Sequence, residues 1–313
     1  MRTNTNKLVI EGYVYQHNLN IKKVERADSP NLGKEFISGT LDVATDENCM
    51  NTLSVHFTYV TETTKNGSKN FTYAALKKII DEGKTVLTDG KENAMKVKCT
   101  PAIALNDFYP QGQDELVSTP RNEGGFVTII NKFDLDEKDR NKFTVDMLIN
   151  KVTHVEADPE KGIEQDFTRV SGAIFNFRND LLPFTVVARD AGAMNYFEGL
   201  NVTGAEPVYT QLWGKIASTT VKKASVTESA FGEDSVETST RTVKEYIVTG
   251  AKKVPYDYGT DETITDEDVK KAIQDRNVML AEVKKRSEEY YNNKNNAITS
   301  EGNTTVPAGG FQF

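Results

Sequence analysis

The chain has 313 residues, of which 37% are hydrophobic and 27% charged, and its formal net charge is −8. No run of about 18 apolar residues occurs, which excludes a transmembrane helix, and residues 1–7 lack the apolar core of a secretion signal. We therefore expect a cytoplasmic protein without a membrane partner. Residues 1–133 carry 16 basic and 16 acidic side chains, so the acidic excess lies later and does not exclude a polyanion ligand.

A sequence pattern near residue 36 returns near residue 169. The segment 36–43 reads FISGTLDV and the segment 169–176 reads RVSGAIFN, so that Gly172 follows Gly39 by 133 residues. Each copy precedes a second apolar strand pattern and then an aromatic patch that ends in leucine. This spacing exceeds the roughly 20–50 residues of solenoid repeats. It predicts two tandem β-rich domains of similar design.

The first unit contains runs of β-branched and aromatic residues separated by turn residues. Alternation places Ile37, Leu41 and Val43 on the core side of one strand. Leu76 and Ile79 share one face of a short helix. In chain order, we expect strands at 7–15, 35–44 and 52–61, a helix at 73–82, and strands at 94–105 and 125–133.

The second unit repeats this order after a charged linker at 134–141. The polar segment 224–239 predicts a long hairpin loop. We expect strands at 142–155, 167–177, 182–189, 207–221 and 241–254.

The character of the chain changes near residue 265. Thr265 to Asp268 resembles a capping box, and Val269 and Ala272 begin an apolar stripe at helical spacing. The stripe predicts an amphipathic helix that docks on its own chain or on a partner. The Asn-, Thr- and Gly-rich residues that follow predict a disordered tail.

Short strands with one helix after the third are typical of the OB-fold, a five-stranded Greek-key barrel. The predicted fold class is therefore mainly β, with two tandem OB-fold-like Greek-key barrels, a C-terminal amphipathic α-helix and a disordered tail. The predicted boundaries are 1–133 for the first OB-like domain, 134–141 for the linker, 142–260 for the second OB-like domain, 261–293 for the helix and 294–313 for the flexible tail.

Signatures of an enzyme are missing from the sequence. There is no phosphate-binding loop and no dinucleotide fingerprint. His17, His56 and His154 lie in none of the usual metal-ligand spacings. Cys49 and Cys99 have no partner motif, and we expect two free thiols. We predict a non-enzymatic protein without catalytic residues, metal or cofactor.

Aromatic side chains on strand faces opposite the core, next to Lys and Arg, suit the binding of single-stranded nucleic acid. Unpaired bases stack on the rings, and cations follow the phosphates. The same rings could instead lie in the core or at an interface, and Phe175 and Phe177 could pack against a neighbouring domain or the C-terminal helix. The candidates for stacking are Tyr13, Tyr15, Phe175, Phe177 and Trp213, and those for phosphate contact are Lys22, Lys23, Arg26, Arg178 and Lys215.

Three segments resemble a known family. Residues 7–15 (KLVIEGYVY) and 36–41 (FISGTL) look like the opening of single-stranded DNA-binding proteins encoded by tailed bacteriophages, and 211–217 (QLWGKIA) resembles the late strand of bacterial single-stranded DNA-binding OB-folds. The resemblance covers about residues 7–255. It implies OB-folds, sequence-tolerant binding of single-stranded DNA, and a role in phage DNA replication or recombination in the host cytoplasm.

The end of the chain departs from this family. Bacterial members carry an acidic C-terminal tip with a terminal phenylalanine that recruits partner enzymes. This chain keeps Phe311 and Phe313 without adjacent acidic residues. We expect these two residues to bind replication or recombination proteins. The alternative is a structural or protein-interaction role, as a virion component or an inhibitor of host defence, with the exposed aromatics forming protein interfaces.

Overall fold

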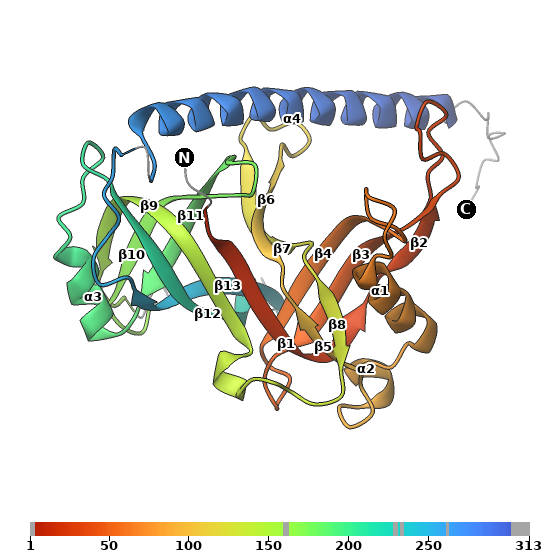
Figure 1. Cartoon of the computed structure of the whole chain (residues 1–313), viewed down its shortest axis with the longest axis horizontal. Helices are drawn as coiled ribbons and strands as arrows, with labels where there is room; N and C mark the ends of the chain where they lie inside the picture. The colour runs from red at the N-terminus through yellow and green to blue at the C-terminus, as the bar shows by residue number, and fades with distance from the viewer. Residues whose placement is uncertain (1–3, 159–162, 228–230, 232–234, 261–262, 302–313) are drawn as a thin grey trace.

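The first repeat unit folds into a closed β-barrel. The computed structural model describes residues 4–158, 163–227, 231, 235–260 and 263–301 (Figure 1). The elements of this barrel are β1 (Asn6–His17), β2 (Asn20–Lys23), β3 (Glu35–Ala44), β4 (Thr52–Thr61), α1 (Phe71–Glu82), α2 (Val86–Asp89), β5 (Lys96–Cys99), β6 (Ala102–Phe108), β7 (Val117–Glu123) and β8 (Val127–Ile130). β1, β3 and β4 pair antiparallel in that order, and β5 returns to β1. β6 pairs with β7, which runs parallel to β4 and closes the barrel.

The second repeat unit has the same topology. A short 3-10 helix, Glu137–Asp139, precedes it, and its elements are β9 (Asn141–Val155), β10 (Phe167–Phe175), β11 (Leu181–Ala188), α3 (Ala191–Glu198), β12 (Val208–Thr227) and β13 (Ser235–Ala251). β9, β10 and β11 pair antiparallel, and β12 returns to β9 after α3. β13 pairs antiparallel with β12 and parallel with β11, which closes the barrel.

Both barrels have the strand order of the OB-fold. In each, three antiparallel strands precede a helix, the fourth strand pairs with the first, and the fifth lies parallel to the third. In the first barrel the fourth strand is divided into β5 and β6, and the fifth into β7 and β8. The predicted fold class is therefore confirmed.

The glycine of each repeat lies where the second strand crosses the first strand closely. A Cβ atom at Gly39 would be 2.4 Å from the carbonyl oxygen of Asn18, and one at Gly172 would be 2.0 Å from that of Leu148. Gly39 also has a φ of 132°, which other residues rarely adopt. The repeated glycine thus reflects the same close backbone approach in both barrels.

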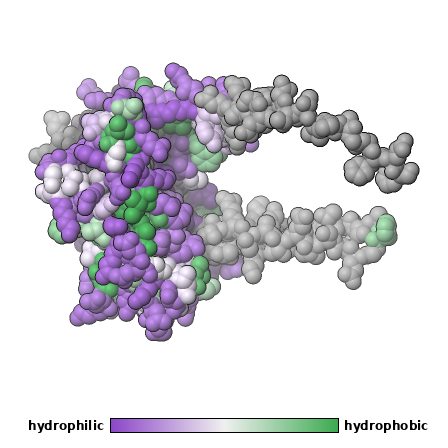
Figure 2. All heavy atoms as spheres, turned by 90° about the vertical axis from the view of Figure 1, so that its right-hand side faces the viewer, coloured by the Kyte–Doolittle hydropathy of each residue, from purple (hydrophilic) through white to green (hydrophobic). Residues whose placement is uncertain are grey.

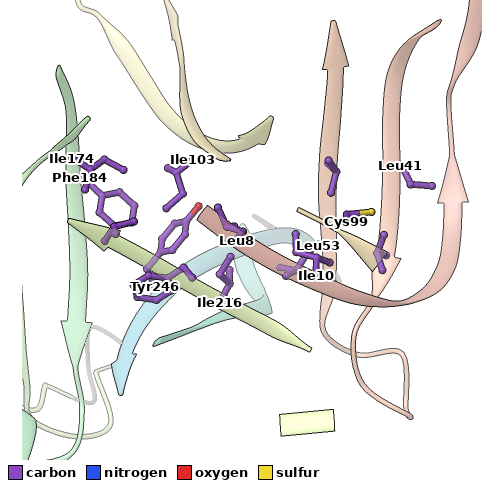
Figure 3. Close-up of a cluster of buried hydrophobic side chains, with 14 of the residues drawn as sticks. Leu8, Ile10, Leu41, Leu53, Cys99, Ile103, Ile174, Phe184, Ile216 and Tyr246 are labelled. Carbon is purple, nitrogen blue, oxygen red and sulfur yellow. The ribbon is translucent and has the colours of Figure 1, made fainter. Parts of the chain in front are cut away.

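The two barrels are joined by their first strands. Residues 6–10 of β1 pair antiparallel with residues 141–145 of β9, with Leu8 opposite Phe143. The buried side chains form one hydrophobic core that continues from barrel to barrel (Figure 3). In the second barrel, Phe184 contacts Phe143 and Tyr246 edge to face, at centroid distances of 6.5 and 4.7 Å.

Helix α4 (Asp266–Glu301) lies across both barrels (Figure 1). It begins with a reciprocal cap, because Thr265 Oγ1 accepts from the backbone of Asp268 and Asp268 Oδ2 accepts from that of Thr265, each at 3.1 Å. Ala272 is buried on the outer face of the second barrel. Arg276 forms an ion pair of 3.0 Å with Asp107 of β6, and both side chains are more than 90% buried. Of the two alternatives for the apolar stripe, docking on its own chain or on a partner, the structure shows docking on its own chain.

Two boundaries differ from those predicted. The segment 224–239 was expected to be a loop, but β12 continues to Thr227 and β13 begins at Ser235, with these two residues paired. Its Thr and Val residues favour extended backbone, and this outweighs its polarity. Helix α4 begins at Asp266, directly after the expected cap Thr265, but it continues through 294–301, which was assigned to the tail. Residues 302–313 lie outside the described residues.

Candidate nucleic-acid interface

The outer face of the second and third strands is the surface on which OB-folds bind oligonucleotides and oligosaccharides. In the first barrel these strands are β3 and β4. Phe36 and Tyr59 meet on this face, with ring centroids 4.7 Å apart and planes inclined by 40°. Tyr59 is 46% exposed, and the burial of Ile37 shows that Phe36 points away from the interior. Lys22 of β2 is the cross-strand partner of Phe36. Lys22, Phe36 and Tyr59 form the surface that we call the Phe36–Tyr59 face.

The three cations predicted near β2 differ in how far their charge is neutralised. Lys22 is exposed and has no ion-pair partner among the described residues. Lys23 lies 3.9 Å from Glu35, and Arg26 donates two hydrogen bonds to Asp28, at 2.6 and 2.7 Å. Lys22 is therefore the cation of this group whose charge is most available to an anionic ligand.

Polar side chains lie on the β3–β4 surface, and a lysine of the second barrel lies near them. Thr40 Oγ1 and His56 Nδ1 are 3.2 Å apart. Burial lowers the pKa of His56, and the positive charges of Arg121 and Lys244 act in the same direction. Burial also lowers the pKa of Lys244, whereas the carboxylate of Asp42 opposes this shift. Lys244 belongs to β13, so the second barrel contributes charge beside the first.

Hydrogen bonds fix the base of the β12–β13 hairpin next to the turn between β3 and β4. The side chain of Asn51 donates to the carbonyl oxygen of Ile216, at 3.1 Å, and accepts from the backbone N–H of Ser218, at 2.8 Å. The position of Lys244 relative to the β3–β4 surface therefore follows from direct contacts between the barrels.

A second exposed surface crosses β12, β9 and β1. Trp213 is opposite Thr144, which is opposite Lys7, and Lys215 is opposite Lys142. Cross-strand partners share a face of the sheet, and the neighbouring Leu212 and Ile216 are buried, so this surface is the outer one. We call the surface formed by Lys7, Lys142, Thr144, Trp213 and Lys215 the Trp213 face.

Trp213 is held on this face by a glycine. A Cβ atom at Gly250 of β13 would be 2.3 Å from the indole Nε1, so the indole lies over the bare backbone of Gly250. The residue remains 38% exposed. Lys142 pairs with Asp139 at 2.8 Å, whereas Lys7 and Lys215 form no ion pair within the described residues. The face thus combines an accessible aromatic ring with two unpaired cations.

Tyr13 lies on β1, next to β5 and the linker between the barrels. It is 7% exposed, its ring meets Phe133 edge to face at 5.0 Å, and its hydroxyl donates to Glu47 at 3.0 Å. Burial, and then the hydrogen bond to Glu47, raise the pKa of Tyr13 to about 12. The hydrogen bond from Arg140 is the main reason that the pKa of Glu47 falls to about 2. In this conformation Tyr13 offers no free face to a base.

The other predicted aromatic residues lie apart from one another. Phe175 is fully buried against Ala272 of α4, which corresponds to the interface alternative for this residue. Phe177 is 88% exposed in the β10–β11 turn, and the Arg178 guanidinium lies 5.1 Å from its ring centroid. Tyr15 is half-buried next to an irregularity in β1. Phe311 and Phe313 lie outside the described residues.

The structure brings together Trp213 and Lys215, and Phe177 and Arg178, but not the five stacking candidates as one set. Sequence reasoning missed Phe36 and Tyr59. Phe36 alternates with the core residue Ile37, and this signal marks it as outward-facing. Its proximity to Tyr59 depends on a register irregularity between β3 and β4, which the sequence pattern does not reveal.

Other classes of site are not apparent in the described part of the chain. No group of three or more His, Cys, Asp or Glu residues there could hold a metal ion. Within those residues, no helix is long and apolar enough to cross a membrane. Cys49 and Cys99 are free thiols, and burial raises the pKa of Cys99 to about 12.

The fold and these surfaces define the protein as a tandem OB-fold protein with exposed aromatic residues beside lysines. The YorF family model matches residues 5–286, and the chain belongs to the YorF family.

Two solved structures of the single-stranded DNA binding protein from Thermus aquaticus are similar to this chain. For a deletion mutant, the identity is 11% and the TM-score 0.46, over 84% of this chain and 100% of the other. For the wild type, the identity is 9% and the TM-score 0.45, over 82% and 96%. The comparison with curated proteins gave no match.

Proposed function

We propose that this protein binds single-stranded DNA without sequence preference and coats it, as a non-enzymatic component of phage DNA replication or recombination in the host cytoplasm. The observation that carries the proposal is the Phe36–Tyr59 face. A ring pair of exposed Tyr59 and half-buried Phe36, beside an unpaired lysine on the ligand-binding strands of an OB-fold, matches what unpaired bases and their phosphates require.

The Trp213 face supplies a second contact surface of the same chemistry. Its ring can stack on a base of any identity, and Lys7 and Lys215 can approach the phosphates on either side. The Phe36–Tyr59 face lies on the first barrel, and the Trp213 face runs from the second barrel onto β1 of the first. We expect one strand to contact both faces. Their lysines account for a local attraction of a polyanion despite the net charge of −8.

The protein-interaction alternative predicts a different kind of surface. Figure 2 shows the end of the molecule that carries β2, β3 and α1, and its visible part is mostly hydrophilic with small, separate hydrophobic areas. Obligate protein interfaces are more hydrophobic and continuous. The hydrophilic character of this end of the molecule is therefore better suited to a charged or polar ligand than to a permanent protein partner.

The experiment compares the double variant Phe36→Ala/Tyr59→Ala with wild type by fluorescence anisotropy on labelled oligo-dT. Each lost base contact costs about 1–3 kcal/mol, so affinity should fall at least roughly fivefold. Phe126→Ala is the matched control, because Phe126 is 75% exposed but lies in the turn between β7 and β8. Wild-type affinity in the folded double variant would remove this face from the binding site.

A further inference from the structure

A cavity of about 730 Å³ lies between α3 and β13 of the second barrel, outside both faces described above. Its volume lies within the range of about 300–1,000 Å³ typical of small-molecule pockets. Ala193 and Tyr196 of α3 form one wall, and Val248 and Ala251 of β13 form the other. The lining is therefore mainly apolar and includes two aromatic rings, those of Tyr196 and Phe197.

The cavity adjoins the Trp213 face through a shared residue. Gly250 lines the cavity, and the indole of Trp213 lies over Gly250. A base stacked on Trp213 would therefore lie next to a residue that lines the cavity. Continuity with the proposed binding surface favours a segment of the same strand as the occupant over an unrelated molecule.

One of the charged residues that line the cavity is available to a phosphate. Lys253 is exposed, lines the cavity, and has no ion-pair partner among the described residues. Arg189 also lines it, but its guanidinium donates two hydrogen bonds to Glu245, at 2.8 and 2.7 Å. The carboxylate of Asp190 caps α3 by accepting from the backbone of Gly192 and Ala193. Lys253 is thus the rim charge that remains available to an anion.

Tyr196 is oriented by its neighbours. Its hydroxyl donates to the carbonyl oxygen of Lys252 at 3.1 Å, and its ring meets Phe197 edge to face at 5.1 Å. Because the hydroxyl and the ring of Tyr196 are both fixed by contacts, the side chain loses little conformational freedom when a planar ligand packs against it. Tyr196 is therefore suited to stack on an inserted base.

We propose that this cavity, the α3–β13 pocket, receives one unstacked base of the bound single strand, next to the base on Trp213. Tyr196 stacks on the inserted base, and Lys253 lies near its phosphate. The inference rests on the proposed function, because it names a further contact made by the same ligand.

The first test fills the pocket. Ala193→Leu places a larger side chain in the cavity, and Ala191→Leu makes the same change at an exposed position of the same helix, outside the lining. We expect Ala193→Leu to weaken oligo-dT binding by roughly 5- to 150-fold, which corresponds to the loss of one stacked base, and Ala191→Leu to leave it unchanged. A folded Ala193→Leu protein with wild-type affinity would overturn the proposal.

A second measurement uses the unaltered protein, in case Ala193→Leu fails to fold. An oligonucleotide that contains 5-iododeoxyuridine is photo-crosslinked to the wild type, and the attachment site is mapped by mass spectrometry. Attachment at Tyr196 supports the pocket. Attachment at Tyr59 or Trp213 but never at the pocket overturns this inference and leaves the proposed function intact. Failure of the wild type to bind the oligonucleotide overturns both.

Discussion

Trp213→Ala tests the Trp213 face through the only tryptophan in the chain. If the ring stacks on one base, its loss should reduce affinity for single-stranded DNA by about 1–3 kcal/mol, or roughly 5- to 150-fold. The reduction should be similar for all base compositions, because stacking requires only the face of a base. Anisotropy titrations with labelled oligo-dT, oligo-dA and a mixed sequence measure it directly.

The same substitution should also destabilise the second barrel, and this effect must be separated from binding. Trp213 is 38% exposed, so most of the residue is covered, and its indole lies against Gly250. Burial of roughly 150 Å² of apolar surface corresponds to about 4 kcal/mol at 25 cal/mol per Å². This figure is an upper value for the loss of unfolding free energy.

Trp213→Phe is the matched control for the loss of stability. It keeps an aromatic face over Gly250 and should retain most of the affinity and most of the stability. Circular dichroism at the temperature of the titration confirms that each variant is folded. A folded Trp213→Ala protein that binds all three oligonucleotides as tightly as wild type would refute the assignment of Trp213 to the binding surface.

Three further predictions concern single charges. Lys22→Gln should reduce the slope of log K against log salt by about 0.7, the value for one lost phosphate contact on a single strand, and an unchanged slope would contradict that contact. Arg276→Ala should lower the unfolding free energy by about 3–5 kcal/mol in chemical denaturation, because it leaves Asp107 buried without its partner, and the exposed Arg286→Ala control should change it by less than about 1 kcal/mol. Glu47→Gln tests the depressed pKa of Glu47, about 2 against an ordinary 4.5. The ionised Glu47 carboxylate stabilises the folded state fully above pH 4.5, and this stabilisation is lost as pH falls towards 2. The difference in Tm between wild type and Glu47→Gln should therefore narrow over this pH range. A constant difference in Tm would contradict the depressed pKa of Glu47.

The architecture was largely predictable from the sequence because its signals are local. The repeat around Gly39 and Gly172 marks a close backbone crossing that is present in both barrels. The alternation at Ile37, Leu41 and Val43 identifies the core face of a strand, and all three residues are fully buried. These features depend on a few neighbouring residues, and sequence periodicity reports them well.

The candidate site was harder to predict because alternation identifies the outer face of a strand but not what covers it. Phe175 does point away from the barrel interior, yet α4 packs over it from a position about 100 residues later in the chain. Tyr13 is covered in the same way, by Phe133 and the linker. Tyr59 remains exposed and Phe36 half-buried, and the contact between the two rings depends on strand register, which is a tertiary property.

Binding of a labelled oligo-dT of about 30 nucleotides, compared with the matching duplex over a salt series, tests the central claim most directly. We predict tight binding to the single strand, weak binding to the duplex, and a steep loss of affinity with salt as phosphate contacts release counterions. Equal affinity for both forms, or no binding to the single strand at low salt, would contradict the proposed function and favour the protein-interaction alternative.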